Sequence, residues 1–226
     1  MLPENFDRPF SSENFINFWG RWHITLSNWL KTYVYNPLMM AGMARVTAPA
    51  LAPYLAVAAF FVTFFLVGLW HGQTSEFLFF GFLQGGGVAA NKLYQVVMQE
   101  RLGRKGYRAL AANPLYRACC RGLTFTWFAF TLFWFWSNWA QIAAFSRALG
   151  PVALVLVWLV ILAGAIIVLA VMEAIRGAVL RITWRDIAVV KSRYVRTAWD
   201  TALVVITVTI IILLDSPAPD IVYKTF

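Results

Sequence analysis

Apolar runs that are long enough to cross a membrane alternate with short polar stretches along most of this 226-residue chain. A membrane-spanning helix needs about 20 mostly apolar residues. In chain order the candidate spans are Leu51–Trp70, a segment from Phe77 to about Asn91, Gly122–Phe145, Pro151–Met172 and Thr201–Leu214. The second and fifth are short for a span. Gly81 and Gly85 in the second predict a close helix–helix contact, because small residues let two backbones approach.

The segment from Phe15 to Tyr35 has a different pattern. At about 100° per residue its aromatic and aliphatic side chains share one broad face, and Asn17, Arg21 and Lys31 fall on the other. This pattern predicts one amphipathic helix that lies in the membrane interface or dips into it. We expect it to end at Asn36-Pro37, because a residue before proline avoids the helical region.

The composition supports a membrane protein. Hydrophobic residues make up 61% of the chain and charged residues 13%, whereas a soluble domain carries about 25% charged residues. The predicted fold class is therefore all-α: a polytopic transmembrane helical protein in contact with membrane lipid. It would have an interfacial or re-entrant amphipathic helix and about five membrane helices.

Basic residues cluster in two predicted loops, Lys92–Arg121 and Glu173–Asp200. Two predicted spans separate these loops, so both fall on one side, and the positive-inside rule makes that side cytoplasmic. The net charge of +9 then reflects topology and gives no reason to expect a nucleic-acid partner. Adjacent cysteines rarely form a good disulfide, and Cys119 and Cys120 suit this reducing side.

The candidate chemistry centres on two histidines, His23 and His71. His71 closes a charge-free run that begins at Val46, and an ionisable group inside a membrane segment usually has a function. The alternative is a structural histidine bonded to a backbone carbonyl. His23 lies at the edge of the amphipathic helix's apolar face, where a purely interfacial polar group is the alternative. Two histidines without nearby cysteines are weak evidence for a metal, so we expect neither a metal nor a tightly bound cofactor.

Two motifs carry a resemblance to a known family. Asn5–Phe10 followed by Phe18–Leu38, which includes His23, and Gly68–Gly72, which includes His71, resemble motifs of the membrane-bound O-acyltransferase family. The similarity is greatest to the bacterial branch that contains alginate O-acetyltransferase and the teichoic-acid D-alanyl transfer protein. Ile221–Phe226 resembles the aromatic C-terminal tail of that branch.

Members of this family usually have several spans before the first histidine motif, so the resemblance implies that residues 1–226 correspond to the C-terminal part of such a transmembrane domain. Residues 1–45 would hold the polar entry and first motif, 46–98 the spans around the second, and 99–226 three further spans and the tail. It also implies a missing N-terminal transmembrane half or other membrane subunit as partner. The implied location is the bacterial cytoplasmic (inner) membrane, with several passes.

The family's reaction is transfer of an acyl group, here expected to be acetyl, from a thioester donor to a hydroxyl. The donor would be acyl-CoA or an acyl carrier protein. The acceptor would be an exported polysaccharide or cell-envelope glycan, reached directly or through a carrier.

Histidine suits general-base catalysis near neutral pH. His71 would take the hydroxyl proton, and His23 would orient the acceptor or polarise the thioester carbonyl. The candidate substrate-binding residues are Trp19, Arg21, Trp22, Ser27, Trp70 and Glu76.

Less specific interpretations stay open from the sequence. The tryptophans of the first motif fit packing and anchoring as well as substrate contact. Glu76 fits a partner of a histidine or a solvated loop residue. The chain as a whole fits an inactive or accessory membrane subunit as an alternative to an enzyme.

The charge asymmetry gives a topology prediction. Single cysteines at Gly106 and Ser192, after Cys119 and Cys120 are replaced by serine, should be shielded from an impermeant thiol reagent in intact cells, whereas a cysteine at Gly150 should react. Labelling of both basic segments from outside would contradict this orientation.

Overall fold

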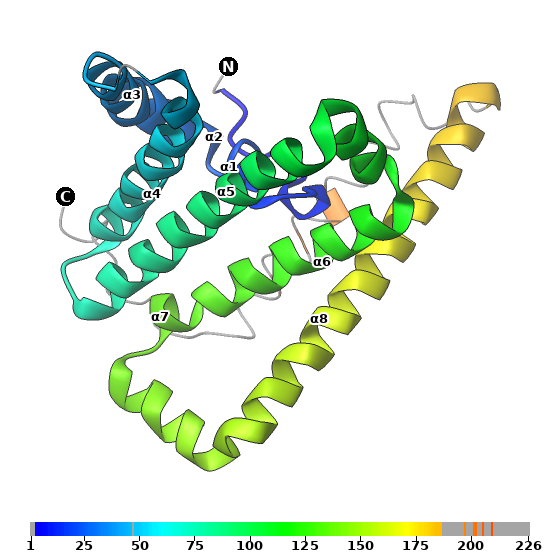
Figure 1. Cartoon of the computed structure of the whole chain (residues 1–226). Helices are drawn as coiled ribbons and strands as arrows, with labels where there is room; N and C mark the ends of the chain where they lie inside the picture. The colour runs from blue at the N-terminus through cyan, green and yellow to red at the C-terminus, as the bar shows by residue number, and fades with distance from the viewer. Residues whose placement is uncertain are drawn as a thin grey trace.

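The computed structural model describes residues 3–46 and 48–186, together with residues 197, 201, 202, 205 and 209. Within that part the elements are helical, which confirms the all-α prediction (Figure 1). They are η1 (Pro9–Ser11), α1 (Phe15–Trp19), α2 (Ile24–Leu30), η2 (Lys31–Tyr35), α3 (Asn36–Met43), η3 (Pro49–Leu51), α4 (Ala52–His71), α5 (Ser75–Ala112), α6 (Pro114–Thr131), α7 (Phe133–Trp136) and α8 (Trp139–Asp186).

Two helices in the described part are long and apolar enough to cross a membrane, Pro49–His71 and Trp139–Ala178. They contain the first and fourth predicted spans. The second predicted span forms the first half of α5. The fifth, Thr201–Leu214, lies almost wholly outside the described residues.

Helices α4 and α5 form a tight antiparallel hairpin (Figure 1). A Cβ on Gly68 would lie 2.5 Å from the Gly81 Cα, and one on Gly85 would lie 2.5 Å from the Phe61 carbonyl oxygen. The two backbones therefore touch where side chains would otherwise keep them apart, as the small residues predicted. The short connection after His71 then fixes that histidine beside the start of α5.

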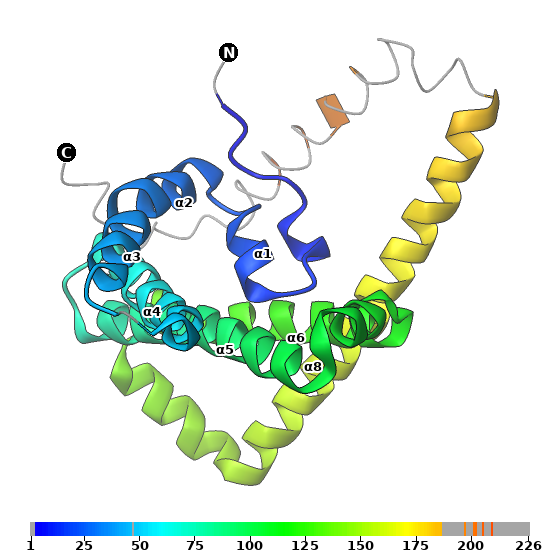
Figure 2. The same ribbon diagram turned by 45° about the horizontal axis from the view of Figure 1, so that its top comes forward.

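The remaining long helices continue this layer. Helix α6 returns beside α5, and α8 packs on α6, where a Cβ on Gly122 would lie 3.0 Å from the Ile166 Cα. Figure 2 shows α8 bent into two arms. The bend falls at Gly150, whose φ of 73° suits glycine, and is followed by Pro151, which cannot continue a regular hydrogen-bond ladder.

The third predicted span, Gly122–Phe145, is wrong as a single helix. Helix α6 ends at Thr131, the short α7 follows, and α8 begins at Trp139. Asn138 causes the break: its side chain accepts from the Gln141 backbone N–H at 2.9 Å, and its own N–H donates to the Gln141 side chain at 3.0 Å. This reciprocal pair is a capping box, which starts a new helix.

The predicted basic loop Lys92–Arg121 is also helical. Helix α5 runs on to Ala112, with one interruption at Gly103, where φ is 67°. Helix α6 starts at Pro114, and the side chain of Asn113 caps it by accepting from two backbone N–H groups. The basic residues are thus carried on helix surfaces.

The predicted amphipathic helix Phe15–Tyr35 is divided into α1, α2 and η2. The break falls at His23, which has φ 46° and ψ 52°. A segment from near the N-terminus stabilises it, because Phe6 forms an antiparallel bridge with Trp22. Asn5 also binds the first turn of α2, accepting from the Thr25 N–H at 3.1 Å and the Thr25 hydroxyl at 2.8 Å.

The predicted helix end at Asn36-Pro37 is wrong as well. Asn36 is helical, with φ −62° and ψ −47°, and α3 follows directly from η2. Element η2 is a π-helical turn. A π turn just before Pro37 removes the clash that the proline ring would make with a carbonyl one turn earlier.

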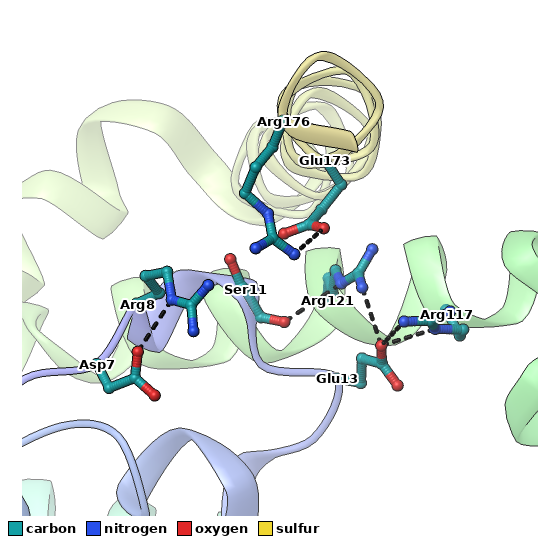
Figure 3. Close-up of polar contacts among 8 residues, drawn as sticks. All are labelled: Asp7, Arg8, Ser11, Glu13, Arg117, Arg121, Glu173 and Arg176. Carbon is teal, nitrogen blue, oxygen red and sulfur yellow. Dashed lines mark hydrogen bonds and ion pairs between the residues drawn. The ribbon is translucent and has the colours of Figure 1, made fainter. Parts of the chain in front are cut away.

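An ionic cluster holds residues 7–13 against α6 and lies close to α8 (Figure 3). Glu13 accepts from Arg117 at 2.7 Å and from Arg121 at 2.9 Å, and Arg121 also donates to the Ser11 carbonyl at 3.3 Å. Arg121 is only 9% exposed. A buried charge needs such pairing, so Glu13 is required to keep Arg121 inside.

The glycine contacts generate a stability prediction. Gly81→Ala should destabilise the purified chain by about 1–3 kcal/mol, because the new methyl group would overlap the backbone of α4. Gly86→Ala is the matched control, since the space around that helical glycine is open and alanine favours the helix by about 1 kcal/mol. Thermal unfolding in detergent, followed by circular dichroism, measures both. A Gly81→Ala midpoint equal to or above that of Gly86→Ala would refute the backbone contact.

Candidate active site

His71 is buried at the last position of α4 with 9% of its surface exposed. Its ring is surrounded by aromatic rings, with centroid distances of 4.7 Å to Trp70, 4.8 Å to Phe135, 5.8 Å to Phe80 and 6.3 Å to Phe77. Its Nδ1 atom is buried and has no hydrogen-bond partner in the described structure. This nitrogen is therefore not held by a backbone carbonyl.

A buried polar atom without a partner costs about 1–3 kcal/mol. Such atoms are rare in folded proteins, and a catalytic role is among the common explanations. Aromatic side chains surround the ring, so a proton acceptor here would act in a medium of lower dielectric constant than water. His71 thus has the burial and the unpaired nitrogen that a general base requires.

His23 lies at the N-cap of α2 in the left-handed backbone region. A non-glycine residue adopts that conformation rarely, although histidine does so more often than most, and such strain is concentrated at functional sites. Its ring packs on Phe6 at 5.1 Å and on Trp22 at 5.4 Å. Burial lowers the pKa of His23, so its imidazole is neutral at neutral pH.

The two histidines are far apart in the sequence but lie within electrostatic range of each other in the fold, so that a charge on one would disfavour a charge on the other. One lies at the end of α4 and the other at the corner between α1 and α2. A neutral imidazole has one acceptor nitrogen and one N–H donor, so one of the two histidines can act as a base while the other donates a hydrogen bond.

Gln84 is a central residue that the sequence analysis missed. It is fully buried in α5, accepts from the Trp19 indole N–H at 3.3 Å, and donates to the Thr131 hydroxyl at 2.8 Å. Thr131 in turn donates to the Phe128 carbonyl at 2.7 Å. This network joins α1, α5 and α6, and so fixes the helix that leads into the His23 corner. In the sequence, Gln84 could have been recognised as a single amide side chain within an apolar run.

The predicted substrate-binding residues around His23 have mixed roles. Trp19 is 3% exposed and packs in the core. Arg21 donates to the Asn17 side chain at 2.9 Å, and Ser27 donates to the Trp22 carbonyl at 3.2 Å. Trp22 is half-buried and stacks on Phe18 while touching His23. Of these residues, Trp22 contacts the His23 ring, and the Ser27 backbone N–H donates to the His23 carbonyl at 2.8 Å.

The other two candidates lie near His71. Trp70 is 42% exposed beside the His71 ring. Glu76 accepts from the Trp139 backbone N–H at 3.1 Å and so holds the first turn of α8. The pKa of Glu76 is lowered by its own backbone N–H and by that of Trp139. The carboxylate of Glu76 is solvated, as one of the two sequence interpretations has it, but the residue lies in the first turn of α5 and caps the start of α8.

No group of three or more histidine, cysteine, aspartate or glutamate side chains among the described residues is placed to hold a metal ion.

Proteins of known name share sequence similarity with this chain. Peptidoglycan O-acetyltransferase of Helicobacter pylori is 37% identical over 93 residues, which cover 41% of this chain and 16% of the relative. Teichoic acid D-alanyltransferase of Streptococcus thermophilus is 33% identical over 127 residues, 54% of this chain and 30% of the relative. A probable alginate O-acetylase of Pseudomonas fluorescens is 37% identical over 89 residues, 39% of this chain and 16% of the relative.

The alignments thus span between 16% and 30% of the length of these relatives. The sequence model of the MBOAT family, described as membrane-bound O-acyltransferase, matches residues 1–135, which include both histidines and the whole α4–α5 hairpin. The match extends over more than half of the sequence and confirms the resemblance seen in its motifs: the chain belongs to the membrane-bound O-acyltransferase family.

Proposed function

We propose that this chain forms the catalytic part of an O-acyltransferase that modifies an exported polysaccharide or a cell-envelope glycan. The observation that carries the proposal is the buried His71, whose Nδ1 has no partner in the described structure, together with a second histidine, His23, whose backbone is strained. The names of the relatives, which acylate peptidoglycan, teichoic acid or alginate, support this class of acceptor.

In the proposed reaction His71 acts as the general base. An alcohol has too high a pKa to attack as an anion, so a base must take its proton while the oxygen attacks the thioester carbonyl carbon. The carbon–sulfur bond then breaks, and the thiolate leaves with the electron pair and recovers a proton from the imidazolium. The acyl group passes directly to the hydroxyl without a covalent enzyme intermediate.

His23 would act on the acceptor hydroxyl or on the thioester carbonyl. Its lowered pKa keeps it neutral, so one ring N–H can donate to a carbonyl oxygen that gains negative charge in the transition state. The left-handed backbone fixes the direction of the ring before substrate arrives, which reduces the entropy lost on binding.

The donor would be acyl-CoA or an acyl carrier protein, with acetyl or a similarly small acyl group transferred. It would approach from the side of the basic helix surfaces, and the acceptor from the opposite side, in the bacterial cytoplasmic membrane. We further propose that additional transmembrane helices complete the site. Two observations support them: the alignments span a minor part of the relatives' length, and Trp70 beside His71 is partly exposed.

A chromosomal His71→Ala substitution in the host tests the assignment. It should lower ester formation on the envelope polysaccharide by about 10²–10⁴-fold, the usual contribution of a general base. The readout is the acyl ester released by mild base from purified polysaccharide. Immunoblotting of membranes should show unchanged abundance of the protein. Ester levels close to those of the parent strain would rule out His71 as the base and would favour an accessory role for the chain.

A second test separates the imidazole of His23 from its backbone strain. His23→Asn should fold normally, since asparagine tolerates the left-handed region, but should lose most acyl transfer. His23→Val should instead lower the thermal midpoint, because a β-branched residue is strained there. Full ester formation by His23→Asn cells would show that the corner has a structural role alone.

A further inference from the structure

A cavity of about 770 Å³ lies between α5, α6 and the start of α1, away from the two histidines. Its size is within the range of small-ligand sites. Phe15 forms part of its wall and stacks on Phe18 at 5.5 Å, and Phe18 stacks on Trp22 at 5.8 Å. These rings stand between the cavity and His23. Neither histidine lines the cavity, so it is separate from the proposed site of acyl transfer.

The cavity has an apolar end and a polar end. Because α5 and α6 are antiparallel, Phe82, Leu83 and Gly87 lie opposite Leu123 and Trp127 at one end. At the other end Tyr94 and Tyr116 are joined by a hydrogen bond of 3.0 Å between their hydroxyls, next to Asn91 and Arg117. The polarity therefore changes along the helix axes, as it does across one leaflet of a bilayer.

The apolar end is open at the molecular surface, since Phe82 is 51% and Leu123 59% exposed. At the polar end Arg117 is paired with Glu13, which also accepts from Arg121, and Glu173 lies near Arg121. The excess of positive charge near this end comes from the adjoining C-terminal half of α5, where Glu100 is outnumbered by Lys92, Arg101, Arg104, Lys105 and Arg108.

We infer that this cavity binds one acyl chain of an anionic phospholipid, whose phosphate lies at the Arg117 end. Basic pockets between membrane helices on the positively charged side are sites where anionic lipid headgroups bind. The apolar walls match an acyl chain, and the surface opening lets the chain enter sideways from the bilayer. The thioester donor fits less well, because neither histidine lines the cavity and the rings of Phe15, Phe18 and Trp22 separate it from His23.

Binding by the purified chain in detergent can be measured by native mass spectrometry. Phosphatidylglycerol and phosphatidylethanolamine with identical acyl chains would be added separately, and the chain should retain phosphatidylglycerol in preference. Gly86→Leu should reduce retention of both lipids by about tenfold or more. The leucine side chain would occupy space that the acyl chain fills, and the loss of protein contact with only two methylene groups of the lipid weakens binding by about that factor. Gly86 lines the cavity, and a β-carbon added there meets no neighbouring atom within 4 Å, so the backbone has room for a side chain at this position.

Gly164→Leu is the matched control. Gly164 is also a helical glycine with open space around it, but it lies in α8 and does not line the cavity. Its lipid retention should equal that of the unaltered chain. Arg117→Gln should reduce the preference for phosphatidylglycerol while retention of phosphatidylethanolamine persists. Circular dichroism of each variant reports whether it folds.

Four outcomes would overturn the proposal. Three are equal retention of the two lipids by the unaltered chain, equal retention of phosphatidylglycerol by Gly86→Leu and Gly164→Leu, and displacement of the lipid by acetyl-CoA. The fourth is displacement of the lipid by inorganic phosphate at millimolar concentration, which would show that the site recognises phosphate and not a lipid. None of these measurements depends on acyl transfer, so they can fail while the proposed function stands.

Discussion

The direct backbone contact between α4 and α5 is the constraint on which the rest of the structure depends. Gly68, Gly81 and Gly85 bring the two helices closer than any side chain would allow. Inside a membrane there is little hydrophobic force between helices, so close packing of this kind supplies much of their attraction. It also fixes the position of His71, which ends α4 only a few residues after Gly68. The histidine is thus placed by helix packing and not by a flexible loop.

The second histidine is placed by long-range contacts. Asn5 binds Thr25, Phe6 pairs with Trp22, and Gln84 holds the Trp19 indole. Each of these contacts acts on one side of the His23 corner, and together they offset the cost of its left-handed backbone. A site fixed in this way before substrate binds reduces the reorganisation required in the transition state. This rigidity connects the packing of the N-terminal segment with the proposed chemistry.

Charge and aromatic rings are separated within the fold. The ionic cluster of Glu13, Arg117 and Arg121 lies at the far end of α6 from Thr131, and it ties the N-terminal segment to the helices (Figure 3). The stacked rings of Phe15, Phe18 and Trp22 form a chain of contacts from the wall of the cavity proposed to hold lipid to His23. They therefore divide this cavity from that histidine.

The sequence by itself determined the helical class, the two clearest membrane spans, both histidine motifs and the glycines of the α4–α5 contact. These features follow from local signals, because hydropathy and small-residue spacing act over one or two helical turns. The tertiary structure decided the break at His23, the joining of Gln84 to Trp19, and the role of Glu76 at the start of α8. In each of these the partner is a residue many positions away, such as Asn5 for Thr25 or Trp139 for Glu76. A local pattern shows that a polar group must be paired when it is buried, but only the folded chain selects its partner.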